Sequence, residues 1–444
     1  MIKQQLQNLK KMGLKEYFRY MFLENRSDGQ TIFKNIFWLF LAEGVNGGLM
    51  FLLTIIIARY LGAEGYGQFA FAMSFTALFA VVADFGLSAL TIREVARDKK
   101  NKKFIDNCIS LKLLLSLATF FLIFFSTFFI DKSPLVKLAV IVAGSHVIIS
   151  NFNVYFTSIY KAFERMESYA KVSIINGIAF ISLLSYLIFV SKSSVVGLLV
   201  GYITVDLLIL IINVVMTKKG FFRVNFDFNK KLILKILKEA WPLALGIVFT
   251  MIYVRIDSVM LSFIKGDKSV GIYAACYNLL FALQGAISIV HHAILPKLST
   301  LYYEKQFERY RRLLKIIFKI SLVCLFPLLI LLSLFSKEML NVIYGPEFTV
   351  GYVALIILFW NGFIIYFSSF YGYSLMMSNR QRRLTLALGI GAVINITLNF
   401  ALIPGFGYIG AAIATIITEI VVMVTVYFLN DKRIRILKLG LKEK

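Results

Sequence analysis

The chain has 444 residues, of which 59% are hydrophobic and only 16% are charged, and its formal net charge is +24. A soluble domain is nearer ~45–50% apolar and ~25% charged, so these proportions, with a mean hydropathy of +0.78, exclude an ordinary soluble protein. Cys108, Cys276 and Cys324 lie far apart, which excludes a disulfide framework and a cysteine-based metal site.

The apolar residues are gathered into stretches long enough to cross a membrane. A transmembrane helix needs roughly 20 consecutive, mostly apolar residues. In chain order, about twelve stretches meet this length: 35–58, 68–92, 107–130, 135–160, 169–190, 195–217, 240–264, 269–295, 313–336, 350–377, 384–403 and 408–429. The sequence therefore predicts an all-α integral membrane protein.

The segments outside the spans are basic and amphipathic. Residues 1–34 carry apolar side chains at helical spacing opposite lysines, which predicts a cytoplasmic interfacial helix or, alternatively, a partly ordered basic tail. Residues 218–239 predict an amphipathic linker helix on the cytoplasmic surface. This linker separates a predicted N-terminal six-helix lobe, 35–217, from a C-terminal six-helix lobe, 240–429. Residues 430–444 form a basic tail.

The positive charge follows the predicted topology. If the N-terminus is cytoplasmic, 38 of the 48 lysines and arginines fall in inner tails and loops, and 7 fall in outer loops. Every inner loop is richer in these residues than its outer neighbours, as the positive-inside rule requires. We therefore expect both termini on the inner face of the cytoplasmic membrane, and the basic excess to contact anionic lipid rather than nucleic acid.

Two pairs of segments repeat between the halves. ARYLGAEGYGQFAFA (58–72) aligns with SFIKGDKSVGIYAAC (262–276) at an offset of 204, and VVGLLVGYITVD (195–206) aligns with YIGAAIATIITE (408–419) at an offset of 213. The first alignment pairs equivalent glycines: Gly62 with Gly266, and Gly67 with Gly271. Because each half has an even number of spans, we expect a pseudo-twofold axis along the membrane normal, with a cavity between the lobes.

Ionisable side chains within the spans are candidates for function. Such a residue near the bilayer centre costs about 2.5–3.5 kcal/mol on insertion, so it usually faces the protein interior or a wet cavity. The candidates are Glu43, Asp84, Asp206, Arg255, Asp257, Lys319 and Glu419.

Arg255 and Asp257 lie past the middle of the seventh predicted span. Two residues correspond to about 200° of rotation on a helix, so the two side chains point to nearly opposite faces and do not pair with each other. Glu43 and Asn46 share a face of the first span, which is the equivalent of the seventh. We expect these four residues to face one central cavity, the alternative being structural pairs with other helices.

The other candidates have clearer structural alternatives. Asp84 and Lys319 lie toward the inner ends of their spans, where a long side chain can reach water. Asp206 and Glu419 lie mid-span, where an interhelical hydrogen bond is the alternative to a place in the lumen. His146 is either a proton carrier or a buried histidine with its hydrogen bonds satisfied.

Motifs that mark an enzyme are absent from the sequence. There is no G-x-x-x-x-G-K-[ST] phosphate loop, so we expect no direct use of ATP. There is no H-E-x-x-H motif and no G-x-S-x-G motif with partners, and the predicted outer loops are short. We therefore expect no catalytic residue, no metal and no cofactor. His291 and His292 end the eighth span and are expected at the membrane interface.

A set of short motifs occurs in order along nearly the whole chain. Together they resemble the polysaccharide flippase branch of the multidrug/oligosaccharidyl-lipid/polysaccharide exporter superfamily, which includes O-antigen and capsule repeat-unit flippases. Besides the two repeated glycine segments they are DFGLSALTIREVAR (84–97), KAFERMESYAKV (161–172), RIDSVMLSF (255–263), ILPKLS (294–299), VIYGPEF (342–348) and NFALIPGFGYIGAAIATIITE (399–419). Lipid II flippases of the superfamily have fourteen spans, and the count of twelve argues against that branch.

The resemblance implies a V-shaped, two-lobed bundle that alternates access and moves a lipid-linked sugar to the outer leaflet. Its partners would be a lipid-linked oligosaccharide such as a polyprenyl-pyrophosphate sugar, membrane lipids, and a polysaccharide polymerase or assembly machinery. Arg255 would meet pyrophosphate or an acidic sugar, with Glu43, Asn46 and Lys319 as further cavity candidates. Asp257, Asp206, Glu419 and Asp84 would be candidates for a coupling H⁺ or Na⁺.

Three other functions remain open at this point. A multidrug exporter of the same superfamily predicts an acidic, aromatic cavity for cations, which Arg255 disfavours. A membrane polysaccharide polymerase or ligase predicts a substantial outer loop with catalytic groups, which the chain lacks. A lipid scramblase would need no coupling ion.

Overall fold

The computed structural model describes residues 28–220, 222 and 225–434. Every regular element in these residues is an α-helix or a short 3₁₀ helix, as predicted. The first half contains α3 (Asp28–Asp84), α4 (Leu87–Arg97), α5 (Lys102–Ser126), α6 (Pro134–Ala162), α7 (Met166–Phe189) and α8 (Val195–Gly220). The predicted interfacial helix at 1–34 lies mostly outside the described residues.

The second half begins with α9 (Lys230–Lys265) and α10 (Asp267–Tyr303). It continues with α11 (Phe307–Leu334), α12 (Ser336–Ile343), the 3₁₀ helix η1 (Pro346–Gly351), α13 (Tyr352–Met377), α14 (Gln381–Leu429) and the 3₁₀ helix η2 (Lys432–Ile434). Residues 230–239, which belong to the predicted linker, form the first turns of α9, so linker and seventh span share one helix.

Local sequence signals fix where several helices start. Ser133 precedes α6, its hydroxyl accepts from the backbone N–H of Val136, and Pro134 occupies the first turn. Proline suits this position because the missing N–H would be unpaired there. Asn229 precedes α9, and its side chain accepts from the N–H of Leu232 at 3.1 Å. Such caps satisfy donors that the first helical turn leaves unpaired.

Glycine breaks two of the long helices into membrane-length segments. Gly62 in α3 has φ 67°, and Gly407 in α14 has φ 57°. Positive φ values are readily adopted by glycine because it lacks Cβ. Nine helices among the described residues are long and apolar enough to cross a membrane. Division of α3 and α14, together with the 37-residue α10, gives the twelve membrane-length segments predicted from the sequence.

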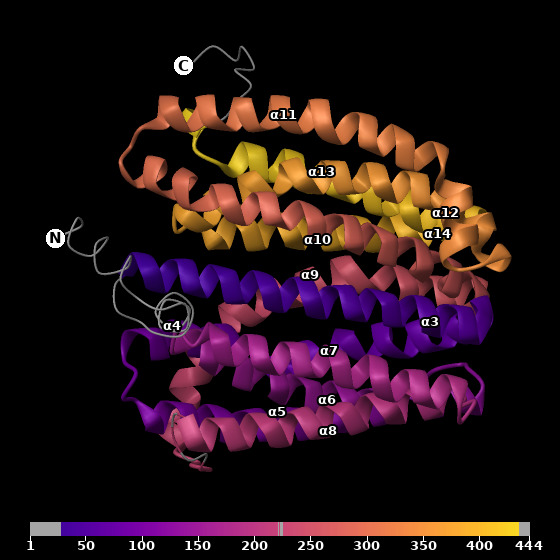
Figure 1. Ribbon diagram of the computed structural model, residues 1–444, viewed down its shortest axis with the longest axis horizontal. Helices are drawn as coiled ribbons and strands as arrows, with labels where there is room; N and C mark the ends of the chain where they lie inside the picture. The colour runs from indigo at the N-terminus through magenta and orange to yellow at the C-terminus, as the bar shows by residue number, and fades with distance from the viewer. Residues whose placement is uncertain (1–27, 221, 223–224, 435–444) are drawn as a thin grey trace, which may run out of the picture.

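The helices form two lobes (Figure 1). Helices α3 to α8 make up the N-terminal lobe, α10 to α14 lie on the other side, and α9 lies between them. Helix α9 packs on α14 of its own lobe and also on α3. We call the end that contains Gly62, Gly266 and Gly407 the glycine end. The opposite end, where α3 begins and α14 ends, is the basic end.

The lobes meet where α3 crosses α10 near the glycine end. A methyl group on Gly67 would lie 1.7 Å from the carbonyl oxygen of Asp267, and one on Gly271 would lie 1.8 Å from that of Ala63. Both pairs are related by the offset of 204 found in the sequence. The two copies of the repeat therefore contact each other reciprocally, as a pseudo-twofold axis between the lobes requires.

Candidate substrate cavity and ion site

Arg255 of α9 lies close to both lobes, since it interacts electrostatically with Tyr66 of α3 and with Tyr277 of α10, and it has no counter-ion among the described residues. Its guanidinium is partly buried and lies 5.9 Å from the ring centroid of Phe281 on α10. It forms no hydrogen bond or ion pair with any residue that the structure describes. A cation over an aromatic face gains a modest stabilisation, but its hydrogen-bond donors remain available to a ligand.

Aromatic and amide side chains link the two lobes near Arg255. Asn278 of α10 donates a hydrogen bond to the hydroxyl of Tyr66 on α3, which links the two lobes. The Tyr66 ring also packs edge-on against Phe348 of η1, at 6.4 Å between centroids. Arg255 therefore lies next to a junction that is closed in this structure.

Polar contacts hold the same junction shut at the glycine end itself. Arg59 donates to the carbonyl oxygens of Val342 and Ile343. The carboxylate of Glu347 accepts from the backbone N–H of Ala63 at 3.0 Å. These contacts join the first lobe to α12 and η1 of the second.

At the basic end, the N-terminal lobe contacts the start of α9. Gly86 lies against α9, since a methyl group there would come within 3.0 Å of the Ala240 carbonyl oxygen. Asn107 of α5 accepts from the backbone N–H of Asn229 at 2.9 Å. Arg93 and Glu239 form an exposed ion pair at 3.5 Å. The first turns of α9 are thus attached to the lobe that precedes them.

Asp257 is buried within the C-terminal lobe and points away from Arg255. It is 1% exposed and accepts from Thr415 at 2.6 Å, from Asn399 at 2.6 Å and from Tyr273 at 2.8 Å. Asn399 also donates to the side chain of Asn395 at 3.1 Å. All of these partners are neutral, and the described residues supply no cation to Asp257.

Glu419 is a second buried carboxylate of the same lobe. It is 5% exposed and accepts a hydrogen bond from Tyr253, which lies one turn before Asp257 on α9. No ion pair to Glu419 is formed within the described residues. The C-terminal lobe therefore holds two carboxylates in neutral surroundings.

Asp206 is part of a network of polar contacts between α6 and α8 of the N-terminal lobe. Its carboxylate lies 2.7 Å from Nδ1 of His146, and it accepts from Asn153. Asn213 donates to Asn153 at 3.0 Å, and Tyr160 donates to Asn213 at 3.0 Å. Asp206 thus has the interhelical partners considered as its structural alternative, and His146 is one of them.

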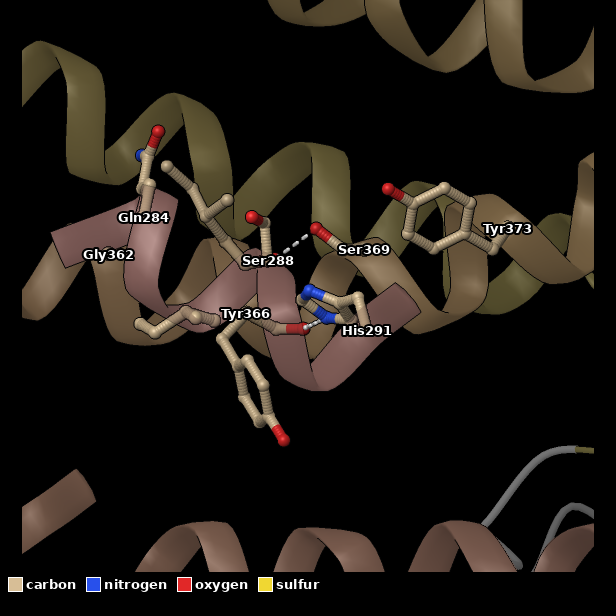
Figure 2. Close-up of a pocket in the computed structure, with 9 residues that line it drawn as sticks. Gln284, Ser288, His291, Gly362, Tyr366, Ser369 and Tyr373 are labelled. Atoms are coloured by element: carbon tan, nitrogen blue, oxygen red, sulfur yellow. Dashed lines mark hydrogen bonds between the residues drawn. The ribbon is translucent and has the colours of Figure 1, made fainter. Parts of the chain in front are cut away.

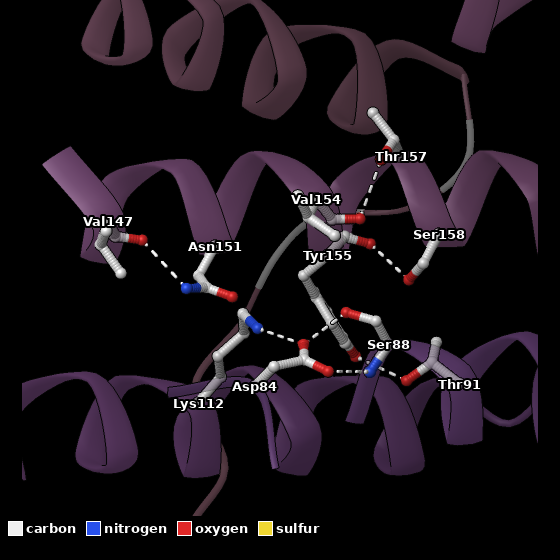
Figure 3. A network of polar contacts seen from close by, with 10 residues as sticks. All are labelled: Asp84, Ser88, Thr91, Lys112, Val147, Asn151, Val154, Tyr155, Thr157 and Ser158. Atoms are coloured by element: carbon white, nitrogen blue, oxygen red, sulfur yellow. Dashed lines mark hydrogen bonds and ion pairs between the residues drawn. The ribbon is translucent and has the colours of Figure 1, made fainter. Parts of the chain in front are cut away.

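Asp84 is neutralised by a buried lysine (Figure 3). Lys112 is fully buried, and its ammonium lies 2.7 Å from the Asp84 carboxylate and 5.5 Å from the ring centroid of Tyr155. Ser88 also donates to Asp84, at 2.5 Å. Because Lys112 already supplies the positive charge, this site has little electrostatic reason to take up a coupling ion.

Glu43, Asn46 and Lys319 have no recorded contact with Arg255 among the described residues. Glu43 is exposed and accepts from Tyr169 of α7 at 2.5 Å. Asn46 lies against Gly177 of α7, since a methyl group there would come within 2.9 Å of its side-chain oxygen. Lys319 is exposed on α11. None of the three forms a hydrogen bond or an ion pair with Arg255, so the predicted common cavity set stays a prediction.

A cavity of 170 Å³ lies between α10 and α13 and was not predicted (Figure 2). Its polar lining residues are Gln284, Ser288, His291, Tyr366, Ser369 and Tyr373. The His291 side chain is 5% exposed, and its Nε2 lies 3.1 Å from the Tyr366 carbonyl oxygen; its expected position at the membrane interface stays a prediction. The sequence signal that could have indicated this cavity is the spacing of residues 284, 288 and 291, which places three polar side chains on one face of a helix.

Comparisons with known proteins agree with this arrangement. The profile of the family described as "Polysaccharide biosynthesis protein" matches residues 32–302, and the MatE profile matches 242–401. A putative O-antigen transporter from Shigella dysenteriae is 24% identical, over 88% of this chain and 98% of its own length. A probable low-salt glycan biosynthesis flippase, Agl15, from Haloferax volcanii is 24% identical, over 85% of this chain and 79% of its own.

Solved structures share the fold. The lipid II flippase MurJ, in an inward closed conformation, gives a TM-score of 0.73 at 19% identity, with 89% of this chain and 87% of MurJ covered. An inward-facing multidrug resistance MATE transporter gives 0.72 at 16% identity, with 90% and 99% covered. The family profile matches more than half of the chain, and the helices form the two lobes described above. The chain therefore belongs to the polysaccharide biosynthesis protein family.

Proposed function

We propose that this protein is a secondary transporter that flips lipid-linked oligosaccharide repeat units across the membrane for surface polysaccharide synthesis. Its family and the relatives named as O-antigen transporter and glycan flippase support this function. The substrate would enter from the leaflet at the basic end and leave at the glycine end. A polymerase or other assembly machinery would then use it.

The unpaired guanidinium of Arg255 carries the proposal. A charged side chain within the membrane is costly unless something in the site compensates it. A polyprenyl-pyrophosphate headgroup supplies oxygens that a guanidinium binds in bidentate fashion. The partly buried position of Arg255 between the lobes gives these phosphates access, while the apolar tail can remain in lipid at the gap between lobes.

The closed glycine end supports alternating access. Contacts from Arg59, Gly67 and Glu347 join the lobes at that end. Solved transporters of similar fold were captured in both inward-facing and outward-facing conformations. We infer that the basic end faces the cytoplasm, since it collects most lysines and arginines, and that the membrane is the cytoplasmic membrane.

Asp257 is our proposed coupling-ion site. The oxygens of Asp257 and Thr415 are suited to Na⁺ or, for the carboxylate, to H⁺. Asn399 Oδ1 is buried and has no hydrogen-bond partner in the part of the chain that the structure describes. An unpaired buried oxygen is costly, and rotation of the Asn399 amide, whose Nδ2 now faces Asp257, would turn this oxygen toward a cation bound there. The residues present therefore fit a hard cation, whose gradient would supply the energy for flipping.

Multidrug export is the second candidate function. The MatE match over 242–401 and the MATE structure favour it. A cavity for cationic drugs requires acidic and aromatic groups, whereas Arg255, which is unpaired among the described residues, carries a positive charge. We therefore rank export of cations below flipping of an anionic headgroup.

Reconstitution into vesicles tests the proposal. Protein in proteoliposomes should move a fluorescent lipid-linked repeat unit between leaflets, as measured by loss of quencher access. Arg255→Ala should lower the rate at least tenfold with normal folding, while Arg312→Ala, an exposed arginine of α11, should leave it unchanged. No flipping by the unmodified protein, with uptake of a cationic dye instead, would replace this function by drug export.

A further inference from the structure

The cavity between α10 and α13 has the chemistry of a neutral, hydroxyl-rich ligand. Its polar lining residues are one glutamine, two serines, two tyrosines and one histidine (Figure 2). No Asp, Glu, Lys or Arg is among the described residues that line it. A site for an ion would require opposite charge, and a site for a lipid tail would lack these hydrogen-bonding groups. Amides and hydroxyls both donate and accept, as sugar hydroxyls do.

Aromatic rings supply flat apolar surface on the same wall. The His291 and Tyr373 rings are 5.8 Å apart between centroids, and His291 also packs against Phe370 at 4.5 Å. The contact of His291 with the Tyr366 carbonyl holds the imidazole in place. Aromatic faces pack well against the C–H face of a sugar ring, since both are apolar there.

The cavity lies on the same face of α10 as the residue that covers Arg255. Phe281 contacts the guanidinium, and Gln284 and Ser288 follow it by three and seven residues. At a rise of 1.5 Å per residue they lie roughly 5 and 10 Å further toward the basic end. A headgroup with its phosphates at Arg255 would therefore place its first sugars along this stripe.

We propose that this cavity is the saccharide subsite of the transporter, which binds a sugar of the repeat unit while Arg255 binds the phosphate. The inference rests on the proposed function and specifies where the sugar binds. Because the subsite contains no fixed charge, it would select for the shape and hydroxyl pattern of the glycan. Arg255 and the lipid-facing gap between the lobes would then select for the polyprenyl-phosphate carrier.

Cysteine protection tests the subsite directly. In a Cys324→Ser background, where Cys108 and Cys276 are buried, Ser369→Cys places one reactive thiol in the cavity. The probes are the lipid-linked repeat unit, the free oligosaccharide released from it by mild acid, and polyprenyl phosphate without sugar. Thr300→Cys, exposed near the end of the same helix α10, is the control.

We expect both glycan probes to slow maleimide labelling of the thiol at 369 at least fivefold, and the sugar-free carrier to leave it unchanged. Labelling at 300 should not respond to any probe. Gln284→Leu should raise the oligosaccharide concentration needed for half-protection about tenfold. Ser288→Cys provides a second reporter if Ser369→Cys does not fold.

Two results would overturn the subsite. One is equal labelling with and without glycan at both reporter positions, and the other is protection by sugar-free polyprenyl phosphate alone. Flipping by the same cysteine variants is measured in parallel. Normal flipping without glycan protection rejects the subsite and retains the transporter function, whereas failure of the unmodified protein to flip rejects the proposed function itself.

Discussion

Lys132 and Asp267 form an ion pair of 2.7 Å that joins the two lobes at the glycine end, and each side chain is only 12% exposed. Lys132 also donates to the carbonyl oxygen of Ser262 at 2.8 Å and lies 5.3 Å from the ring centroid of Phe71. The junction is therefore held by polar groups that water can satisfy when it opens. Such contacts suit a gate that has to close and open repeatedly.

Removal of this ion pair should favour the state open at the glycine end. Lys132→Met leaves Asp267 without its ammonium partner, a loss of about 1 kcal/mol or more, which changes the ratio of states roughly fivefold. Spin labels at the exposed positions 192 and 337 should report a larger share of long distances. Lys137→Met, in the same region but without an ion pair among the described residues, should leave the distribution unchanged.

A methyl group at the glycine crossing should prevent closure more strongly. Gly67→Ala would place its Cβ 1.7 Å from the Asp267 carbonyl oxygen, which is inside van der Waals contact, so the backbones have to separate. We expect flipping to fall at least tenfold and the same spin labels to move apart. Gly405→Ala is the control, because nothing lies within 4 Å of its Cβ. Unchanged distances in Gly67→Ala would show that the crossing does not act as a gate.

Neutralisation of Asp257 should uncouple transport from the ion gradient. Asp257→Asn nearly preserves the shape of the site but removes the charge that attracts a cation. We expect flipping in proteoliposomes to lose its dependence on an imposed H⁺ or Na⁺ gradient. Glu308→Gln, at an exposed carboxylate of α11, should retain it. A gradient dependence that survives in Asp257→Asn would move the coupling site elsewhere, with Glu419 as the next candidate.

The Asp84–Lys112 pair should matter for stability and not for coupling. Asp84→Leu leaves the fully buried Lys112 ammonium unpaired, which costs about 3–5 kcal/mol, and should lower the thermal stability of the detergent-solubilised protein sharply. The double variant Asp84→Leu with Lys112→Met should recover much of that loss, because it removes both charges. Recovery of stability without ion-coupled transport in the double variant would contradict the structural role.

Much of the architecture could be predicted from the sequence, because a chain that crosses lipid has to do so as long apolar helices. Each membrane-length apolar stretch became a helix, and the offset of 204 paired Gly67 with Gly271, although their contact across the lobes was not predicted. The sequence did not predict that residues 230–239 would continue into the seventh span, because an amphipathic pattern does not show where one helix ends and the next begins.

The partners of charged residues were harder to predict. Arg255 and Asp257 were placed on opposite faces correctly, since helix geometry alone requires that. The burial of Lys112 beside Asp84 depends on how α3 and α5 pack, and no local pattern specifies this. The cavity around His291 likewise depends on the spacing between α10 and α13, which sequence periodicity does not contain.

The continuity of α9 gives Arg255 two mechanical attachments. The helix begins at Lys230, where its first turns and the preceding segment are bound to the N-terminal lobe through Asn107 and Gly86. Its far end carries Asp257 and packs within the C-terminal lobe. A rocking motion of one lobe against the other would therefore change the tilt of α9. Arg255, near the far end of α9, would move with the helix. Binding of the substrate phosphate at Arg255 and binding of the ion at Asp257 would then change in the same conformational step.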